Sequence, residues 1–281
     1  MEDIVISTPS GYSLPACLYE SNAGLPGAGP LVLISSATAV PRRYYRHFAQ
    51  YLADNGARAV MTYDYRGING ELRHLDNYRV RMSDWAVIDM PAVISYLRAL
   101  FPDHELAGFG HSFGGQALGL TGRHGDFERY MTLCSGSGYL GHTREPEKLW
   151  RGMNLIGLPL ALSLGKLPRA AGMGEPLPFG AFNQWRRWCN SPDYFMSDET
   201  VPERDRFADV TTTMAFVGFE DDDWATREST EAMMRWYARA NGQLRWFDRN
   251  ETGGSVGHFG FFRPDHRETL WPQIADWLIR N

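Results

Sequence analysis

Residues 104–115, HELAGFGHSFGG, contain the most informative pattern in the chain. Residues 104–109 predict a short strand, and Gln116 begins a stretch typical of a helix. The intervening GHSFGG has the form GxSxG, in which Gly110 and Gly114 leave room for a sharp turn at Ser112. Such a turn exposes the serine hydroxyl at the carboxyl end of a strand and at a helix N-terminus, which favours developing negative charge. The pattern therefore predicts a nucleophilic Ser112.

Two other patterns compete with this interpretation. Residues 253–257, GGSVG, form a second GxSxG, but they follow a polar stretch and precede no helix, so Ser255 is interpreted as a loop residue. Gly108, Gly110 and Gly114 also fit GxGxxxG, a dinucleotide-binding spacing. A Rossmann unit places its glycines after the first strand of the domain, whereas two strand–helix units precede this one. The nucleophile interpretation is therefore favoured.

Strands and helices alternate on both sides of the turn. Short apolar runs predict strands, and apolar residues at helical spacing predict helices. This alternation predicts an α/β fold, with a mostly parallel central sheet of about eight strands flanked by helices on both faces. After an N-terminal hairpin, the expected strands are residues 31–34, 57–63, 104–109, 130–134, 213–217 and 243–247, and the expected helices are residues 44–54, 83–99, 116–122, 227–241 and 267–279.

Residues 136–205 interrupt the alternation, because they are rich in Gly, Pro, Trp and Leu and contain no clear strand. An insertion that does not join the sheet is interpreted as a cap over it. The chain is thus divided into a core domain, residues 1–136 and 206–281, and an inserted helical cap, residues 137–205. Some apolar residues of the cap are expected to line a substrate pocket. Most are expected to form its own core and its contact with the main domain, among them Leu158, Leu160, Leu162 and Leu164.

A serine nucleophile needs a base and a carboxylate that orients the base. Among eight histidines, His258 lies between two glycines, after the last expected strand and before the final helix, so it is the expected base. Three adjacent aspartates, Asp221, Asp222 and Asp223, follow the strand expected at residues 213–217, and one of them is expected to be the acid. A capping cluster or a calcium-binding loop is the alternative, although the spaced ligands of an EF-hand are missing.

The order of serine, aspartate and histidine resembles that of the α/β-hydrolase superfamily, and the resemblance extends from the N-terminal hairpin to the C-terminal helix. Residues 63–67, YDYRG, resemble its D-x-R-G turn, and residues 89–97 resemble the D-x-x-x-x-x-x-Y-L pattern of the helix before the serine turn. Many relatives have a proline four residues after the catalytic aspartate. Thr226 occupies that position, which selects Asp222, with Asp221 as the alternative.

The narrower resemblance is to the serine aminopeptidase and monoglyceride-lipase-like branch, including its uncharacterised bacterial members. Relatives often have His-Gly after the first core strand, where this chain has SSATA at residues 35–39. A backbone N–H does not require histidine. The resemblance therefore implies an oxyanion hole formed by the Phe113 N–H together with the N–H of Ala37 or Thr38.

Composition excludes several classes of protein. The 281 residues are 43% hydrophobic and 22% charged, which argues against disorder. A net charge of −5 without a basic stripe argues against a nucleic-acid partner. Three dispersed cysteines without a CxxC pair argue against a disulfide framework and a structural zinc site. We find neither a signal-peptide pattern nor the about 18 apolar residues of a spanning helix, so a cytoplasmic protein without a stable membrane anchor is expected.

Together these features predict a carboxylesterase- or lipase-like serine hydrolase (EC 3.1.1). It would cleave a carboxylic ester or thioester of a small, apolar acyl substrate through an acyl-enzyme, with no cofactor and no metal. The alternatives are an acyltransferase, amidase or peptidase on the same fold, or a non-catalytic small-molecule-binding protein. Dehalogenase and epoxide hydrolase chemistry is disfavoured, because those relatives use aspartate where this chain has Ser112. The oligomeric state is left open, with a homodimer as one alternative.

Overall fold

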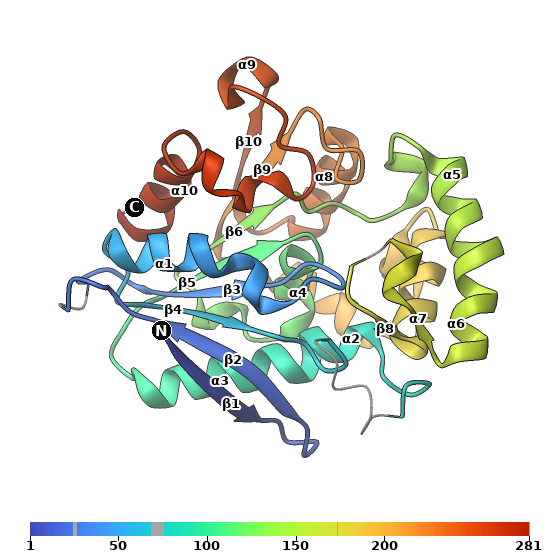
Figure 1. Ribbon diagram of the computed structural model, residues 1–281, viewed down its shortest axis with the longest axis horizontal. Helices are drawn as coiled ribbons and strands as arrows, with labels where there is room; N and C mark the ends of the chain where they lie inside the picture. The colour runs from blue at the N-terminus through green and yellow to red at the C-terminus, as the bar shows by residue number, and fades with distance from the viewer. Residues whose placement is uncertain (25–26, 69–75, 173, 281) are drawn as a thin grey trace.

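The central sheet is built from short, apolar runs of sequence. Its strands are β1 (Glu2–Ser7), β2 (Ser13–Tyr19), β3 (Leu31–Ser35), β4 (Ala59–Tyr63), β5 (Leu106–His111), β6 (Arg129–Leu133), β9 (Thr213–Phe219) and β10 (Asn241–Phe247). Figure 1 shows them in the computed structural model, which describes residues 1–24, 27–68, 76–172 and 174–280. The eight strands form one sheet in the order β1-β2-β4-β3-β5-β6-β9-β10. Within it β2 runs antiparallel to both of its neighbours, and the pairs from β4 to β10 are parallel.

The strands at the centre of the sheet are buried on both faces. Every residue of β3, β4 and β5 is buried, which accounts for their nearly continuous apolar sequences. The predicted α/β fold, with a mostly parallel sheet of about eight strands, is therefore confirmed.

Helices cover the two faces of the sheet and enclose two hydrophobic cores. One face packs against α1 (Arg46–Asp54) and α10 (Trp271–Arg280), and the other against α3 (Met90–Leu100), α4 (Phe113–Thr121) and α8 (Arg227–Met234) (Figure 1). Two shorter helices, α2 (Met82–Asp84) and α9 (Arg249–Thr252), also lie outside the insertion. None of the helices in the described ranges is both long enough and apolar enough to cross a membrane.

Several element boundaries differ from the sequence prediction. The α4 helix begins at Phe113, three residues earlier than expected, and β5 continues to His111. The helix expected at residues 227–241 is shorter, because α8 ends at Met234, a 3₁₀ turn follows, and β10 already begins at Asn241.

A buried ion pair joins the two segments that resemble superfamily motifs, residues 63–67 and residues 89–97. The Arg66 guanidinium donates two hydrogen bonds to Asp89 Oδ1, at 2.8 and 2.6 Å, and the Arg66 backbone N–H donates to Asp89 Oδ2 at 2.9 Å. Asp64 instead accepts from Arg42, whose guanidinium lies 2.8 Å away. The Arg66–Asp89 pair ties the turn after β4 to the helical segment that ends in α3, and the Arg42–Asp64 pair ties it to the 3₁₀ turn before α1.

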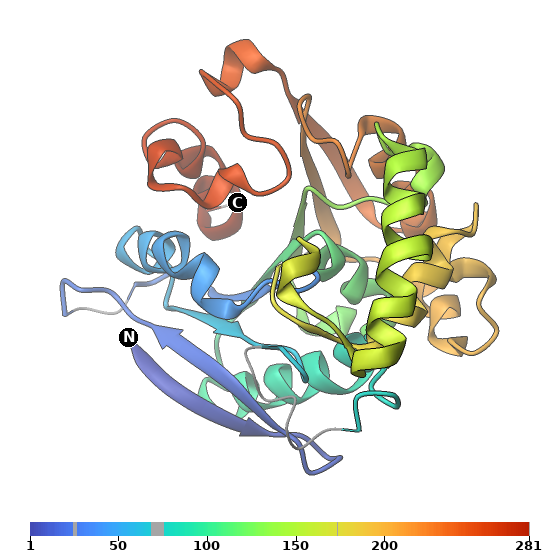
Figure 2. The ribbon, with the colours of Figure 1, turned by 45° about the vertical axis from the view of Figure 1, so that its right-hand side comes forward.

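The insertion between β6 and β9 does not join the central sheet. It contains α5 (Pro146–Arg151), α6 (Leu158–Leu164) and α7 (Phe179–Cys189), together with a separate two-stranded sheet, β7 (Lys166–Leu167) and β8 (Leu177–Pro178), that the sequence did not indicate. Both ribbon views place the green and yellow α5–α7 segment to one side of the central sheet (Figures 1 and 2).

The packing of the insertion differs in part from the prediction. Phe182 and Trp188 of α7 are buried in the same core as α3 and α4, so this part of the insertion is seated on the main domain as expected. The alternating leucines are different. Leu162 is 54% exposed and Leu164 is 52% exposed, so these two are not among the apolar residues that form the core of the insertion or its contact with the main domain.

Candidate active site

Candidate site residues follow the carboxyl ends of four strands of the parallel sheet. β3 leads to Ala37 and Thr38, β5 to Ser112, β9 to Asp222, and β10 to the loop that contains His258. Because neighbouring parallel strands end at the same edge, residues far apart in sequence meet there. The topology therefore explains how residues 37, 112, 222 and 258 come together.

Ser112 occupies a strained turn between β5 and α4. Its backbone dihedrals are φ 53° and ψ −114°, a conformation that residues other than glycine rarely adopt. The glycines on either side are required by packing. A Cβ on Gly110 would lie 2.4 Å from the Gly114 carbonyl carbon, and one on Gly114 would lie 2.2 Å from the Ser35 carbonyl oxygen. The turn holds the Ser112 side chain at the start of α4, as the sequence predicts.

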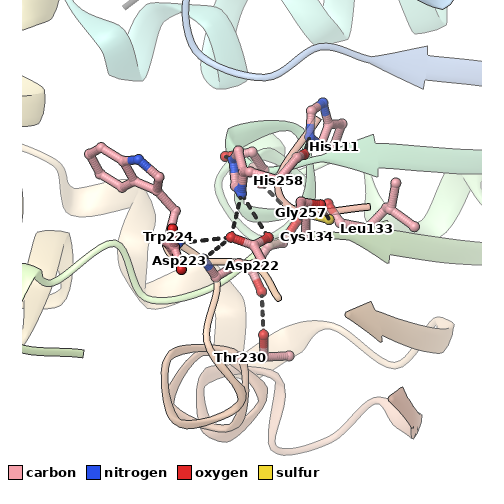
Figure 3. A network of polar contacts seen from close by, with 12 residues as sticks. His111, Leu133, Cys134, Asp222, Asp223, Trp224, Thr230, Gly257 and His258 are labelled. Atoms are coloured by element: carbon pink, nitrogen blue, oxygen red, sulfur yellow. Dashed lines mark hydrogen bonds and ion pairs between the residues drawn. The ribbon is translucent and has the colours of Figure 1, made fainter. Parts of the chain in front are cut away.

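Ser112, His258 and Asp222 form a continuous hydrogen-bonded chain. His258 Nδ1 lies 2.8 and 3.0 Å from the two carboxylate oxygens of Asp222, and His258 Nε2 lies 3.1 Å from Ser112 Oγ. An ionised carboxylate only accepts, so the proton belongs on Nδ1, and Nε2 is left to accept from the Ser112 hydroxyl. Figure 3 shows the Asp222 carboxylate directed at the His258 ring.

The environment of Asp222 keeps its carboxylate charged. Its side chain is fully buried, and Oδ1 accepts from the backbone N–H groups of Trp224 and Ala225 at 2.8 and 2.9 Å. Burial alone would raise the pKa of Asp222. The neighbouring His258 and the two N–H donors outweigh burial, and the pKa of Asp222 lies below its usual value.

The other two aspartates have different contacts. Asp221, the alternative acid, points away from the His258 ring and accepts from Ser255 Oγ at 2.7 Å and from the N–H groups of Val256 and Gly257 at 2.9 Å. Those three bonds hold the loop that carries His258. Asp223 is 64% exposed and lies 3.4 Å from the Arg144 guanidinium. The geometry thus places Asp222, and not Asp221, against the histidine. Ser255, in the second GxSxG, lies in this loop after α9 and does not lie at a strand–helix turn.

The expected oxyanion-hole donors differ in whether their N–H groups already have a hydrogen-bond acceptor. Phe113 is the first residue of α4, and among the described residues neither its N–H nor that of Thr38 has a hydrogen-bond acceptor. The Ala37 N–H, by contrast, donates to the Tyr45 hydroxyl at 2.9 Å. This contact disfavours Ala37 as the second donor and favours Thr38, the alternative given by the sequence.

A cavity of about 580 Å³ opens over Ser112 and His258. Its walls are largely apolar and include Val40 from the loop after β3 and Phe259 from the loop after β10. The insertion contributes Trp185, whose ring stacks on that of Trp224 with centroids 5.7 Å apart. The candidate nucleophile and base thus lie in a concave, mostly apolar site, which is typical of small-molecule binding.

Comparison with known proteins assigns the family. Residues 25–267 match the sequence model of the family described as "Alpha/beta hydrolase family". The chain belongs to the alpha/beta hydrolase family. No curated protein sequence matches the chain significantly. The narrower resemblance to the serine aminopeptidase and monoglyceride-lipase-like branch stays a prediction.

Several solved structures share the fold over nearly the whole chain. Est1E from Butyrivibrio proteoclasticus is 17% identical, with a TM-score of 0.64 and coverage of 99% of this chain and 97% of its own. The esterase EaEST from Exiguobacterium antarcticum is 14% identical, with a TM-score of 0.66 and 99% coverage of both chains. A thermophilic esterase from Thermogutta terrifontis is 16% identical, with a TM-score of 0.61 and coverage of 99% and 98%. At these identities the similarity concerns the fold alone.

Three residues of the hydrolase site were not anticipated from the sequence as parts of the site. Tyr45 and His111 are fully buried beside the Ser112 turn and contact each other. Cys134, after β6, has a positive φ of 49° and lies beside Asp222 and His258 (Figure 3). Sequence spacing offers no signal for these contacts, since the three residues come from three different segments.

Cys134, Asp222 and His258 are side chains of the kind that bind zinc, and their potential ligand atoms lie within 4.8 Å of one another. They fit a metal ion poorly. Metal-binding cysteine must be deprotonated, whereas burial and the Asp222 charge raise the pKa of Cys134 well above its usual value. His258 Nδ1 is also occupied by Asp222. This arrangement therefore favours a histidine–carboxylate pair over a metal centre.

Proposed function

We propose that this alpha/beta hydrolase is a serine hydrolase that cleaves a carboxylic ester or thioester through an acyl-enzyme. The observation that carries the proposal is the hydrogen-bonded chain from Ser112 to His258 to Asp222, at a strained turn on the floor of an apolar cavity. Serine is a weak nucleophile unless an adjacent base removes its proton. The three residues have the mutual geometry that this activation requires.

In the proposed reaction, Ser112 Oγ attacks the substrate carbonyl carbon while its proton moves to His258 Nε2. Asp222 stabilises the resulting imidazolium and holds its orientation. Collapse of the tetrahedral intermediate transfers that proton to the leaving alcohol or thiol. A water molecule then attacks the acyl-enzyme and gives a proton to His258. Collapse of the second tetrahedral intermediate releases the acid, while His258 returns that proton to Ser112 Oγ. We assign stabilisation of the oxyanion to the Phe113 and Thr38 N–H groups.

Two features support an ester of a largely apolar acid as the substrate. The surface of the cavity is more apolar than polar and includes Trp185 from the insertion, and charged side chains also line it (Arg43, Arg46, Arg169 and Glu175). Structures with the same fold include proteins described as esterases. We also propose that residues 137–205 act as a cap, because this segment supplies one wall of the cavity while Ser112 and His258 come from the core domain.

The proposal is tested by hydrolysis of matched p-nitrophenyl esters, a thioester and an anilide with acyl chains of two to about twelve carbons. We expect the wild type to hydrolyse esters and Ser112→Ala to lose about 10³-fold or more in kcat. Ser255→Ala, the serine of the second GxSxG, serves as the control and should lose no more than a few-fold, because it removes only one of the three hydrogen bonds that Asp221 accepts from the loop that carries His258. Equal turnover by Ser112→Ala and wild type would contradict the assignment, and preferential cleavage of the anilide would replace the esterase with an amidase.

A further inference from the structure

Behind the Ser112 turn, a buried chain of hydrogen bonds joins three segments that are distant in sequence. The Tyr45 hydroxyl lies 2.9 Å from the Ala37 N and 3.0 Å from His111 Nδ1. His111 Nε2 lies 2.8 Å from the backbone carbonyl oxygen of His258. Tyr45 and His111 have no solvent exposure, and both rings pack against Phe262, at centroid distances of 4.7 and 5.0 Å.

The direction of each hydrogen bond in this series follows from the two backbone groups at its ends, the His258 carbonyl and the Ala37 N–H. The His258 carbonyl can only accept, so His111 Nε2 carries a proton and donates. Burial, followed by the nearby His258, lowers the pKa of His111 to about 3, so His111 is neutral at ordinary pH and Nδ1 must accept from the Tyr45 hydroxyl. The Tyr45 oxygen then remains free to accept from Ala37. Each donor therefore has a matching acceptor, and only one tautomer of His111 fits.

We propose that Tyr45 and His111 are positioning residues that hold the oxyanion loop, the nucleophile turn and the base loop in one fixed arrangement. Ala37 precedes Thr38, His111 precedes Ser112, and the third contact is with the backbone of His258 itself. The chain thus fixes the backbone beside each proposed reacting group without touching substrate. This inference rests on the proposed serine hydrolase function, because it assigns roles relative to that chemistry.

The role of Tyr45 follows from the two buried polar groups that its hydroxyl binds, the Ala37 N–H and His111 Nδ1. Without it, the Ala37 N–H and His111 Nδ1 would be buried without their present partner, and such groups seek other contacts. The peptide between Ser36 and Ala37 would then lose its anchor, and the Thr38 N–H, which belongs to the next peptide, would no longer be held in a fixed direction. Misplacement of catalytic groups by about 1 Å costs on the order of 100-fold in rate.

Tyr45→Phe is the first test, with Tyr237→Phe as the matched control. The Tyr237 hydroxyl is also buried and also bridges two backbone groups, accepting from the Gly119 N–H at 3.1 Å and donating to the Gly115 carbonyl at 2.7 Å, but those groups lie within α4. Tyr45→Phe loses two hydrogen bonds, and Tyr237→Phe loses at least as many, since the Tyr237 hydroxyl also lies 3.5 Å from the Gln116 carbonyl oxygen. Active sites are titrated with a fluorophosphonate, and ester hydrolysis is expressed per titrated site, so that loss of folded protein does not count as loss of rate.

We expect kcat per titrated site to fall about 10- to 100-fold in Tyr45→Phe, with KM changed less than threefold, and to stay within twofold of wild type in Tyr237→Phe. Equal rates per site in the two variants would overturn the positioning role. His111→Gln, whose amide can still donate to the His258 carbonyl, should retain more activity than His111→Phe, which keeps neither bond. If His111→Gln and His111→Phe are equally impaired, the link to His258 is refuted.

A measurement that needs no activity separates this inference from the proposed function. Side-chain ¹⁵N NMR of wild type should show His111 as the neutral Nε2–H tautomer from pH 8 down to pH 5. The Nδ1–H tautomer, or an imidazolium above pH 5, would overturn the chain of hydrogen bonds even in an active enzyme. A wild type with no fluorophosphonate adduct and no turnover would refute the proposed function, and with it the positioning role.

Discussion

Adjacent aspartates after β9 are distinguished by what their carboxylates accept. Asp222 accepts from His258 and from two backbone N–H groups, whereas Asp221 holds the loop around Gly257. The sequence could favour Asp222 only through the position of Thr226 relative to a family pattern. Asp221 holds its loop through hydrogen bonds to Val256 and Gly257, which follow it by 35 and 36 positions in the sequence. No local sequence pattern encodes contacts over that separation.

The two aspartates should therefore respond differently to the same substitution. Asp222→Asn removes the charge that stabilises the His258 imidazolium and disturbs its tautomer, and we expect kcat to fall by about 10⁴-fold. Asp221→Asn keeps the geometry of Asp222 and weakens only the loop, so a fall of about 10-fold is expected. Steady-state ester hydrolysis by both variants checks this prediction. A larger loss in Asp221→Asn than in Asp222→Asn would exchange the two roles.

His111 should make stability depend on pH. Its folded pKa of about 3 lies below the value of about 6.5 for an unfolded histidine, so between these values the unfolded chain binds more protons. Its contribution to stability is therefore full above about pH 6.5 and is lost as pH falls toward 3. The slope approaches about 1.4 kcal/mol per pH unit.

This dependence is measured by urea unfolding of wild type and His111→Gln between pH 7 and 4.5. We expect wild type to lose more free energy of unfolding than the variant over this range. Parallel curves for the two proteins would show that His111 binds protons equally in the folded and unfolded states, and would contradict a lowered pKa of His111.

At the scale of elements, the turn from β5 to α4 depends on small residues for packing. A Cβ on Gly115 would lie 2.3 Å from Ser135 Oγ and would be crowded by side chains, whereas a Cβ on Gly110 or Gly114 would meet backbone atoms. The sequence prediction began the helix at Gln116, because Gly114 and Gly115 are weak helix formers. Packing against β3 and the residues after β6 outweighs that propensity, so the helix starts directly after Ser112.

Gly114→Ala should accordingly be far more disruptive than replacement of a glycine that faces open space. Its Cβ would meet the Ser35 carbonyl oxygen at 2.2 Å, and we expect the free energy of unfolding to fall by about 1–3 kcal/mol or more, with loss of fluorophosphonate labelling. At Gly125 a Cβ meets nothing within 4 Å, so Gly125→Ala is the control and should be nearly neutral. Comparable stability of the two variants in urea would argue against the packing explanation.

At the scale of the whole molecule, the sequence predicted the order of strands and helices well and the surroundings of the insertion less well. Apolar runs report burial on both faces of the sheet directly, which is why β3, β4 and β5 were recognised. The alternation of leucines in the insertion gives no such information. Whether Leu162 and Leu164 face a core depends on how α6 is seated, and both are about half exposed.

The insertion should affect substrate selectivity more strongly than it affects the rate of the chemical step. Trp185 is 7% exposed and forms part of the cavity wall by stacking on Trp224. In Trp185→Ala we expect KM for an octanoyl ester to rise about 10-fold, because apolar contact area is lost, while kcat/KM for an acetyl ester stays within about threefold. Trp150→Ala is the control, since Trp150 is 45% exposed and does not line this cavity. Equal effects on both esters would place the acyl chain elsewhere.

Every step of the proposed reaction depends on Ser112 being an activated nucleophile. The most direct measurement is the intact mass of the protein after treatment with a fluorophosphonate probe, for wild type, Ser112→Ala and Ser255→Ala. We predict one adduct on wild type and on Ser255→Ala, and none on Ser112→Ala. An adduct on Ser112→Ala, or none on folded wild type, would contradict the central claim that the chain from Ser112 through His258 to Asp222 makes this serine reactive.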